Sequence, residues 1–264
     1  MSLVAPHGGT LVNRVVDQAK AEALKKESQG LTKVVLSLRE QCDLEMIAIG
    51  AFSPLTGFMG QADFTSVCKE MRLSTVKAHG SAVGLAWSIP VTLCPPDEVT
   101  AKINPGQKIA LLDDKNRLLA VMTVAEKYPH DKQLEIPNVY KTQDDGHPGV
   151  AITRAQGNFC LAGAIDVINP NYEPEFPDYR NSPARTREMF EKKGWSTIVA
   201  FQTRNPIHRS HEYLTKVALE QTDGLMIHPL VGETKKDDIP AQTRMDCYKT
   251  LVDNYYNKDR TILS

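Results

Sequence analysis

A proline-rich segment divides the sequence into two parts that differ in character. The 16 residues INPNYEPEFPDYRNSP (168–183) contain four prolines. Because proline fixes its own φ angle and lacks an N–H, such a segment holds neither a regular helix nor a central strand. We therefore expect a boundary here, with one domain over residues 1–170 and a second over residues 171–264.

The part before the boundary is rich in short apolar runs separated by turn residues. Runs such as TKVVLSL, KIALLD and LLAVMTVAEKY have the length and composition of strands. Between two of these runs, Asp113–Asn116 predicts a hairpin turn. Helical periodicity is clearest over Gln61–Met71. We predict a β-rich, barrel-like domain with one or two helices.

The part after the boundary alternates between helical and strand-like segments. Ser182-Pro183 is typical of a helix start and Gly194 of a helix end, around ARTREMFEKK. Next come a strand over 196–201, a helix over 211–221, a strand over 225–231, a helix over 240–255 and a strand from 260. This alternation predicts an α/β fold with a parallel, Rossmann-like sheet.

The sequence stops as the third strand of this sheet begins. A parallel sheet of two or three strands cannot bury both of its faces. We therefore expect further chain to complete the sheet, so that the second domain is truncated here.

Composition excludes several classes of protein. The net charge of −1 gives no bulk attraction to nucleic acid or to a membrane surface. No apolar run approaches the roughly 18 residues of a membrane span, and MSLVAPHGGTLVNRVV at the start lacks the pattern of a secretory signal. The five cysteines are widely spaced with no CxxC pair. We therefore expect reduced thiols rather than disulfides or a structural zinc site.

The segment Ser196–Glu212 carries the strongest functional signal. Its apolar run STIVAF ends at the polar string QTRN, and we expect Pro206 to open a helix. The free N–H groups and partial positive charge of a helix N-terminus favour anions. Arg204 offers a planar fork of donors for a tetrahedral oxyanion, and we expect His208 and His211 on one face of the helix. These features predict a polyanionic substrate.

The histidine pair admits other interpretations. A lone HxxH on a helix is most often incidental. A zinc protease helix needs HExxH, with the histidines four residues apart. Here the spacing is three and Arg209 follows the first histidine, so the zinc interpretation fails on geometry. The HxGH motif with which nucleotidyltransferases hold ATP phosphates fits better, although Ser210 replaces its glycine.

Longer strings resemble one family. QTRNPIHRSHE (202–212) resembles the signature of ATP sulfurylase, also called sulfate adenylyltransferase. Three further strings are similar to other stretches of that family, in the same order: GAFSPLTGFM (50–59), DDGHPGV (144–150) and HPLVGETKKDDIP (228–240). The resemblance covers residues 45–260.

The resemblance implies a reaction. The family condenses sulfate with MgATP to give adenosine 5′-phosphosulfate (APS) and pyrophosphate, and a sulfate oxygen attacks the α-phosphorus in line. By motif match, six residues take overlapping roles: sulfate binding by Gln202 and Arg204, catalysis by Thr203, Arg204, Asn205, His208 and His211, and ATP binding by all six.

The resemblance also implies the setting of this reaction. The first domain would be a PUA-like barrel and the second a nucleotidyltransferase domain. Mg²⁺ would enter with ATP, and no metal would be held by the protein itself. We expect a cytoplasmic homo-oligomer whose partners are ATP, sulfate, APS and pyrophosphate, with no nucleic acid and no membrane.

One departure from the family leaves alternatives open. The family's second motif, GRDH, does not occur in these 264 residues. Together with the truncated sheet, its absence predicts little or no adenylyltransferase activity for this chain alone. The alternatives are a nucleotidyltransferase with another acceptor and a non-catalytic module that binds RNA or another partner.

Overall fold

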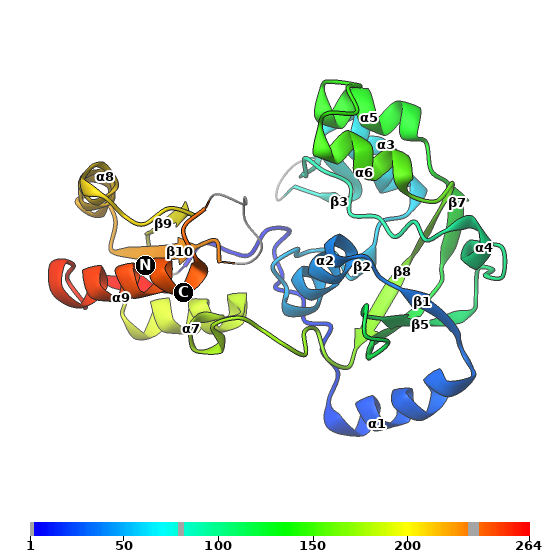
Figure 1. Cartoon of the computed structure of the whole chain (residues 1–264), viewed down its shortest axis with the longest axis horizontal. Coiled ribbons are helices and arrows are strands. Elements are labelled where there is room, and N and C mark those ends of the chain that lie inside the picture. The colour runs from blue at the N-terminus through cyan, green and yellow to red at the C-terminus, as the bar shows by residue number, and fades with distance from the viewer. Residues whose placement is uncertain (1–2, 79–81, 232–237) are drawn as a thin grey trace. The chain divides into compact units, whose positions relative to one another are not determined.

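The chain forms two compact units. The computed structural model describes residues 3–78, 82–231 and 238–264 (Figure 1). One unit is Ala5–Tyr172, and the other is Glu173–Ser264 together with Leu3 and Val4. Leu3, for example, packs beside Phe190 and Trp195 of the second unit.

The first unit is built on a mainly antiparallel sheet. Its described strands follow the order β1-β5-β6-β8-β2, and β7 also pairs with β8. Only the β1–β5 pair is parallel among the described pairings of this sheet. The strands are β1 (Thr32–Val35), β2 (Gly57–Phe58), β5 (Lys108–Leu112), β6 (Leu118–Thr123), β7 (Glu126–Pro129) and β8 (Phe159–Val167), with β3 (Arg72–Lys77) and β4 (Gly84–Ala86) as a separate pair.

The prediction of a β-rich barrel is confirmed only in part. The hairpin at Asp113–Asn116 is present, because β5 and β6 pair across it. Within the described part of the chain, however, no pairing joins β1 to β2, so the sheet stays open. Its apolar residues form one large buried cluster with those of the covering helices.

The prediction of one or two helices in this region is wrong. The predicted helix at Gln61–Met71 is confirmed, but others accompany it. In one of them, Ser37 and Glu40 form a reciprocal capping box that starts a helix directly after the strand-like run TKVVLSL. The described helices are α1 (Gln18–Glu27), η1 (Ser28–Gly30), α2 (Leu38–Ile49), α3 (Gln61–Glu70), α4 (Asp97–Thr100), α5 (Lys132–Tyr140) and α6 (Pro148–Ala155).

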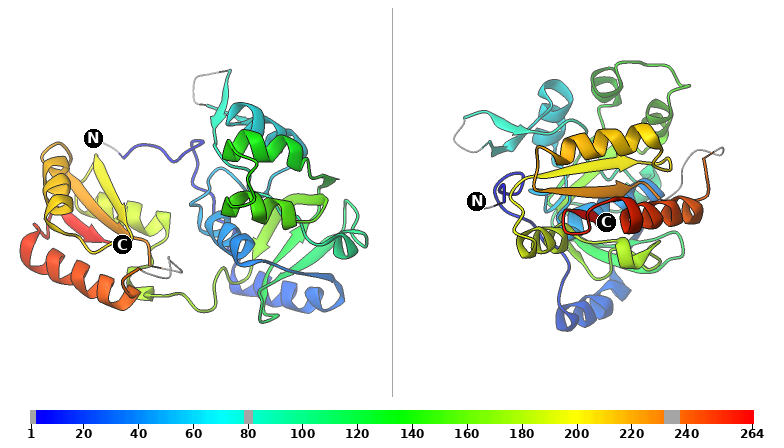
Figure 2. Two further views of the ribbon diagram at one scale, coloured as in Figure 1. Left: turned by 45° about the horizontal axis from the view of Figure 1, so that its top comes forward. Right: turned by 90° about the vertical axis from the view of Figure 1, so that its left-hand side faces the viewer.

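The second unit has the predicted parallel sheet (Figure 2). Its strands follow the order β11-β10-β9, and both pairings are parallel. Ser182 caps the first long helix by accepting a hydrogen bond from the Arg185 N–H, as predicted. The elements are η2 (Pro177–Tyr179), α7 (Pro183–Lys192), β9 (Ile198–Thr203), α8 (Arg209–Leu219), β10 (Gly224–Pro229), α9 (Ala241–Tyr255) and β11 (Thr261–Leu263). No described helix of the chain is long and apolar enough to cross a membrane.

Helices cover both faces of this small sheet. Leu225 and Ile227 of β10 share a buried cluster with Leu219 of α8 and with Met245 and Tyr248 of α9. On the opposite face, residues of β9, β10 and β11 pack with α7: Ile198, Met226, Ile262, Met189 and Phe190. The argument that a sheet of so few strands cannot bury both of its faces therefore does not hold for this unit.

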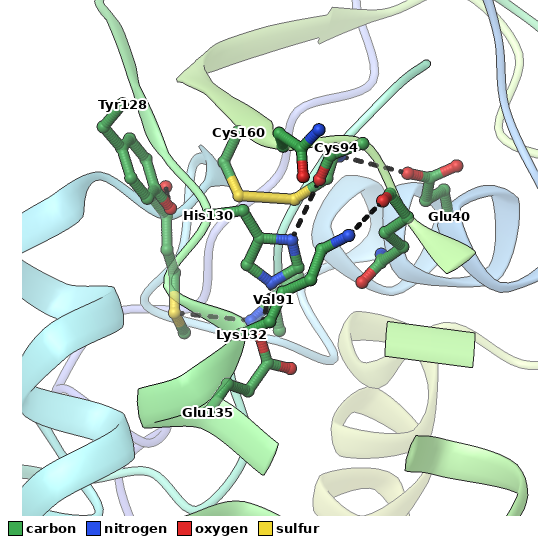
Figure 3. Close-up of a disulfide and its surroundings, with 12 residues drawn as sticks. Glu40, Val91, Cys94, Tyr128, His130, Lys132, Glu135 and Cys160 are labelled. Carbon is green, nitrogen blue, oxygen red and sulfur yellow. Dashed lines mark hydrogen bonds and ion pairs between the residues drawn. A yellow bond between two sulfur atoms is a disulfide. The ribbon is translucent and has the colours of Figure 1, made fainter. Parts of the chain in front are cut away.

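The disulfide between Cys94 and Cys160 corrects the expectation of reduced thiols (Figure 3). Cys160 lies on β8, and Cys94 follows Leu93, which forms an isolated antiparallel bridge with Leu161. The two cysteines are therefore opposite each other across paired chains, although 66 residues separate them in the sequence. Cys68 and Cys247 are free thiols, as expected.

Asp43 of α2 is an acidic residue in an unfavourable environment. It lines a cavity of about 830 Å³ together with Arg39, Phe52, Arg72 and Trp87. Burial raises the pKa of Asp43 to about 6, although Arg39, whose Nε lies 3.9 Å from the carboxylate, opposes the shift. An acid whose pKa is raised by folding destabilises the folded state wherever it must ionise.

The substitution Asp43→Asn tests this burial. The stability associated with protonated Asp43 is full below pH 4 and is lost as pH rises through about 6. Removing the charge should therefore raise the free energy of unfolding by roughly 1–3 kcal/mol at pH 8 and change it little at pH 4. Urea denaturation at both values measures the difference. Asp145→Asn, at a residue whose side chain is 74% exposed, is the control; a pH-independent effect of Asp43→Asn would contradict the burial.

Candidate active site

The predicted anion site lies at the carboxyl ends of β9 and β10. Gln202 and Thr203 are the last residues of β9, and they pair with His228 and Pro229 of β10. The Leu230 N–H then donates to the Thr203 carbonyl at 2.9 Å, which keeps the chains together beyond the strands. In open α/β sheets, ligands bind at this edge, where loops leave the strands.

The loop after β9 is fixed by hydrogen bonds to its backbone. The Asn205 N–H donates to Thr203 Oγ1 at 3.0 Å, and the hydroxyl of Tyr248 on α9 donates to the Asn205 carbonyl at 2.7 Å. Arg204 keeps 39% of its side chain exposed, and its Nε lies 3.7 Å from the Asp238 carboxylate. The guanidinium is therefore held at the edge of the sheet with donors left for an anion.

The helix that follows begins later than predicted. α8 starts at Arg209 rather than at Pro206, and His208 is its N-cap residue, with an extended backbone (φ −104°, ψ 178°). Ile207, 8% exposed, packs into the core of the unit, and the extended backbone of His208 follows it, so the first helical turn forms only after these two residues.

The two histidines nevertheless lie together. The ring centroids of His208 and His211 are 3.9 Å apart, and the His211 ring lies 5.5 Å from that of Phe201 on β9. His208 Nδ1 contacts Ser210 Oγ at 3.0 Å. Their proximity comes from the turn into α8 rather than from a shared helical face.

The N-terminus of α8 presents polar groups that lack partners among the residues that the structure describes. No side chain of the described residues caps it. Nδ1 of His211 is buried and has no hydrogen-bond partner within the described part of the chain. A buried polar atom left in this state costs about 1–3 kcal/mol, and such atoms in native proteins call for an explanation. A bound ligand supplies one, since the helix N-terminus adds N–H donors and a positive field.

Arg244 of α9 holds both loops of this edge in place. Only 1% of the residue is exposed, and its guanidinium donates to backbone carbonyls in two different segments. The acceptors are the carbonyls of Arg204 in the loop after β9, and of Leu230, Val231 and Ile239 in the chain between β10 and α9. The two loops therefore share one anchor.

The sequence carries one signal for the buried Arg244. Arg244 lies on the buried stripe of α9 with Met245 and Tyr248. A charged residue on a core-facing helical position needs internal partners, because burying its charge without them is costly. The partners are backbone carbonyls, which no side-chain motif reveals.

The six predicted site residues occupy one continuous segment of this edge, from Gln202 to His211. The neighbouring string HPLVGETKKDDIP contributes His228, which pairs with Gln202, whereas residues 232–237 of it lie outside the described residues. DDGHPGV lies in the other unit, where His147 is the N-cap of α6.

Comparison with known proteins agrees with this geometry. Residues 4–170 match the family model of a PUA-like domain, and residues 177–264 match the ATP-sulfurylase model. The second unit of the chain is therefore an ATP-sulfurylase family domain. The second match contains β9, the polar loop and the histidine pair.

Several relatives share nearly the whole chain. A sulfate adenylyltransferase of Synechococcus sp. (strain JA-3-3Ab) is 49% identical over 261 residues, which are 99% of this chain and 64% of that protein. A probable bifunctional SAT/APS kinase 2 of Sorangium cellulosum is 48% identical over 99% of this chain and 44% of its own length. A solved structure, the hexameric APS kinase from Thiobacillus denitrificans, matches with a TM-score of 0.74 and 30% identity over 100% of this chain and 46% of that chain.

The substitution Arg244→Met tests the shared anchor. It removes the guanidinium and leaves several buried carbonyls without donors, so the free energy of unfolding of the second unit should fall by about 2–4 kcal/mol. Trp195, which is 5% exposed in this unit, reports its unfolding by fluorescence in urea in a Trp87→Phe background. Arg185→Met, at an exposed residue paired with Glu188, should stay within about 0.5 kcal/mol. Equal effects of the two substitutions would contradict the anchor.

Proposed function

We propose that this chain carries the sulfate- and ATP-binding segment of a sulfate adenylyltransferase, which joins sulfate to ATP and yields adenosine 5′-phosphosulfate and pyrophosphate. The chain spans about 64% of the length of the sulfate adenylyltransferase relatives that it matches. The observation that carries the proposal is the Arg204 loop and the His208–His211 pair at one sheet edge, beside a helix N-terminus that no side chain of the described chain caps.

Arg204 and Gln202 would bind sulfate. A guanidinium donates two parallel hydrogen bonds to a tetrahedral oxyanion, and a neutral amide adds a donor without adding charge. Thr203 and Asn205 support this geometry from within the loop, since the Asn205 N–H is bound to Thr203 Oγ1. The Arg244 guanidinium donates to the Arg204 carbonyl and so fixes the backbone of this loop.

His208 and His211 would bind the phosphates of ATP. Their rings lie 3.9 Å apart at the start of α8, and a phosphate oxygen would satisfy the buried Nδ1 of His211. In the reaction a sulfate oxygen attacks the α-phosphorus and pyrophosphate leaves from the opposite side. No covalent enzyme intermediate is required, so the protein contributes position and electrostatic stabilisation of the developing charge.

Mg²⁺ would arrive as part of MgATP. Mg²⁺ prefers oxygen ligands and usually keeps several waters while it binds substrate phosphates. At this edge the carboxylate of Asp238 is already engaged by Arg204, and the other site residues are arginine, histidine, amide and hydroxyl groups. This donor set fits a metal carried by the nucleotide rather than one held by the protein.

We place the protein in the cytoplasm, where ATP is available, and propose that it assembles as a homo-oligomer. The structural relative from Thiobacillus denitrificans is a hexamer. The partners of this chain would be ATP, sulfate, adenosine 5′-phosphosulfate and pyrophosphate. The net charge of −1 offers no attraction to nucleic acid.

Sulfate binding by Arg204→Ala tests the proposal. Loss of charge-assisted hydrogen bonds worth about 1.5–3 kcal/mol should weaken sulfate binding roughly 10–150-fold. Titration calorimetry with sulfate, in the presence of a non-hydrolysable MgATP analogue, measures this. Arg209→Ala is the matched control, because it removes the same charge from a residue whose side chain lines a separate pocket with Tyr213 and Tyr255.

Each outcome of this titration has a defined meaning. Arg204→Ala that binds sulfate as the unaltered chain does, or Arg209→Ala that loses binding equally, would contradict the assigned role. A chain that binds the nucleotide but neither sulfate nor molybdate would contradict sulfate as substrate and favour a nucleotidyltransferase with another acceptor.

A further inference from the structure

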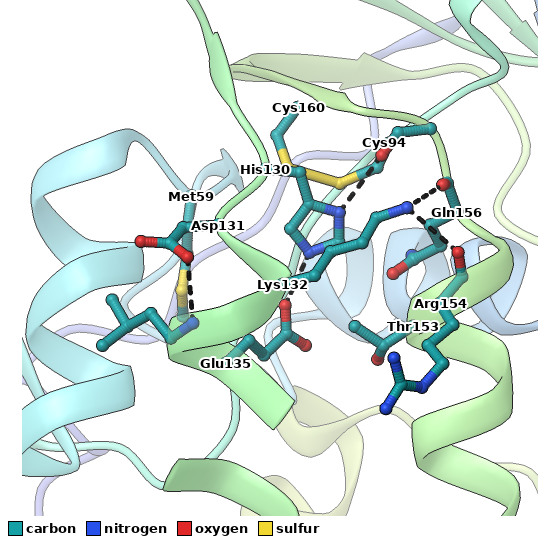
Figure 4. Close-up of polar contacts among 12 residues, drawn as sticks. Met59, Cys94, His130, Asp131, Lys132, Glu135, Thr153, Arg154, Gln156 and Cys160 are labelled. Carbon is teal, nitrogen blue, oxygen red and sulfur yellow. Dashed lines mark hydrogen bonds and ion pairs between the residues drawn. A yellow bond between two sulfur atoms is a disulfide. The ribbon is translucent and has the colours of Figure 1, made fainter. Parts of the chain in front are cut away.

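A buried group of metal-ligating side chains lies in the first unit. Cys94, His130 and Cys160 are all buried, and their potential ligand atoms lie within 4.8 Å of one another. They come from three segments: the chain before α4, the junction of β7 and α5, and strand β8. Figure 4 shows the imidazole of His130 directly beside the two sulfur atoms.

His130 is oriented by a buried carboxylate. Its Nε2 lies 2.6 Å from Glu135 Oε2, and the two side chains are 0% and 2% exposed. The other nitrogen, Nδ1, is 3.3 Å from the Gly157 carbonyl, a long contact on the side of the ring near the sulfur atoms (Figure 3). In the neutral tautomer that donates its Nε2–H to Glu135, Nδ1 is unprotonated and makes no hydrogen bond to the Gly157 carbonyl, so its lone pair can bind a cation.

This carboxylate–histidine arrangement is characteristic of metal sites. A histidine that binds a metal almost always donates its other ring N–H to a carboxylate, a carbonyl or water, which fixes its tautomer and orientation. Thiolate and imidazole together suit Zn²⁺, which takes N and S ligands in tetrahedral geometry. A tetrahedral site places ligand atoms roughly 3.5–3.8 Å apart, which side-chain rotation provides once the sulfur–sulfur bond is open.

We propose that, when the Cys94–Cys160 disulfide is reduced, Cys94, His130 and Cys160 bind one Zn²⁺ ion. A dithiol reductant donates two electrons and two protons; the Sγ–Sγ bond breaks, two thiols form, and the reductant becomes a disulfide. Zn²⁺ then replaces the two thiol protons, which leave to solvent. The fourth position takes water, since no further histidine, cysteine or carboxylate of the described residues joins this group.

Charge favours the metal over two bare thiolates. The cysteines belong to an apolar cluster with Phe64, Tyr128 and Ala162, where an uncompensated charge is expensive. Two thiolates and one Zn²⁺ carry no net charge, so the site can be buried at low cost. The disulfide and the zinc site are then alternative, mutually exclusive ways of joining Cys94 to β8, and the zinc form also binds the β7–α5 junction.

Cobalt titration of the reduced chain tests the proposal. The probe is Co²⁺, added to the 264-residue protein under anaerobic conditions after tris(2-carboxyethyl)phosphine reduction and removal of the reductant. We expect one Co²⁺ per chain, with a sulfur-to-cobalt charge-transfer band and the visible bands of tetrahedral Co²⁺, and displacement by one equivalent of Zn²⁺. The oxidised chain should show none of these bands.

Substitutions of the proposed ligands test which residues bind the metal, and control substitutions of the other cysteines show whether a loss of binding comes from misfolding. Cys94→Ser and Cys160→Ser should each weaken Co²⁺ binding more than tenfold, and Glu135→Gln by about 10–100-fold. Cys68→Ser is the matched control: its thiol lies in the same apolar cluster, and burial raises its pKa to about 12. A chain with Cys42, Cys68 and Cys247 all replaced by serine keeps the pair and should bind as the unaltered chain does.

Three results would overturn the zinc site. The first is a reduced, folded chain, checked by circular dichroism, that binds no Co²⁺. The second is the triple serine variant, folded but without the charge-transfer band. The third is undiminished binding by Cys94→Ser. None of these readouts depends on adenylyl transfer, so they are independent of the function proposed for the second unit.

Discussion

The rest of the site depends on the hydrogen bonds that the buried guanidinium of Arg244 donates. Burying a charged group is costly unless each of its donors finds an acceptor. Here the acceptors are carbonyls of the loop after β9 and of the chain between β10 and α9. One side chain thus makes the positions of two loops interdependent. Such preorganisation strengthens anion binding by donors at the sheet edge, because the donors need not reorient when an anion binds.

The sequence predicted the second unit well because its signals are local. Ser182 at a helix start, the apolar run STIVAF and the alternation of strand and helix each act over a few residues. The parallel order β11-β10-β9 follows from that alternation. The proximity of His208 and His211 was also predicted, although its cause was not. Their rings meet because His208 is the N-cap residue, in the turn that leads into α8, and not because both residues lie on one helical face.

What the sequence did not reveal depends on contacts between distant residues. Cys94 and Cys160 meet because their chains pair across 66 intervening residues. Arg244 binds backbone carbonyls. Every residue has one, so the partners of Arg244 have no sequence signature. α2 was missed for a different reason: its capping box at Ser37 and Glu40 is local, but the neighbouring strand-like runs concealed it.

A crystal structure of the chain with adenosine 5′-phosphosulfate bound would test the central claim most directly. The account predicts the sulfuryl group against Arg204 and Gln202 and the phosphate near His208 and His211, with a ligand oxygen within hydrogen-bond distance of the His211 Nδ1 that is otherwise buried without a partner in the described chain. A ligand bound away from the carboxyl ends of β9 and β10, or one that leaves Arg204 paired only with Asp238, would contradict it.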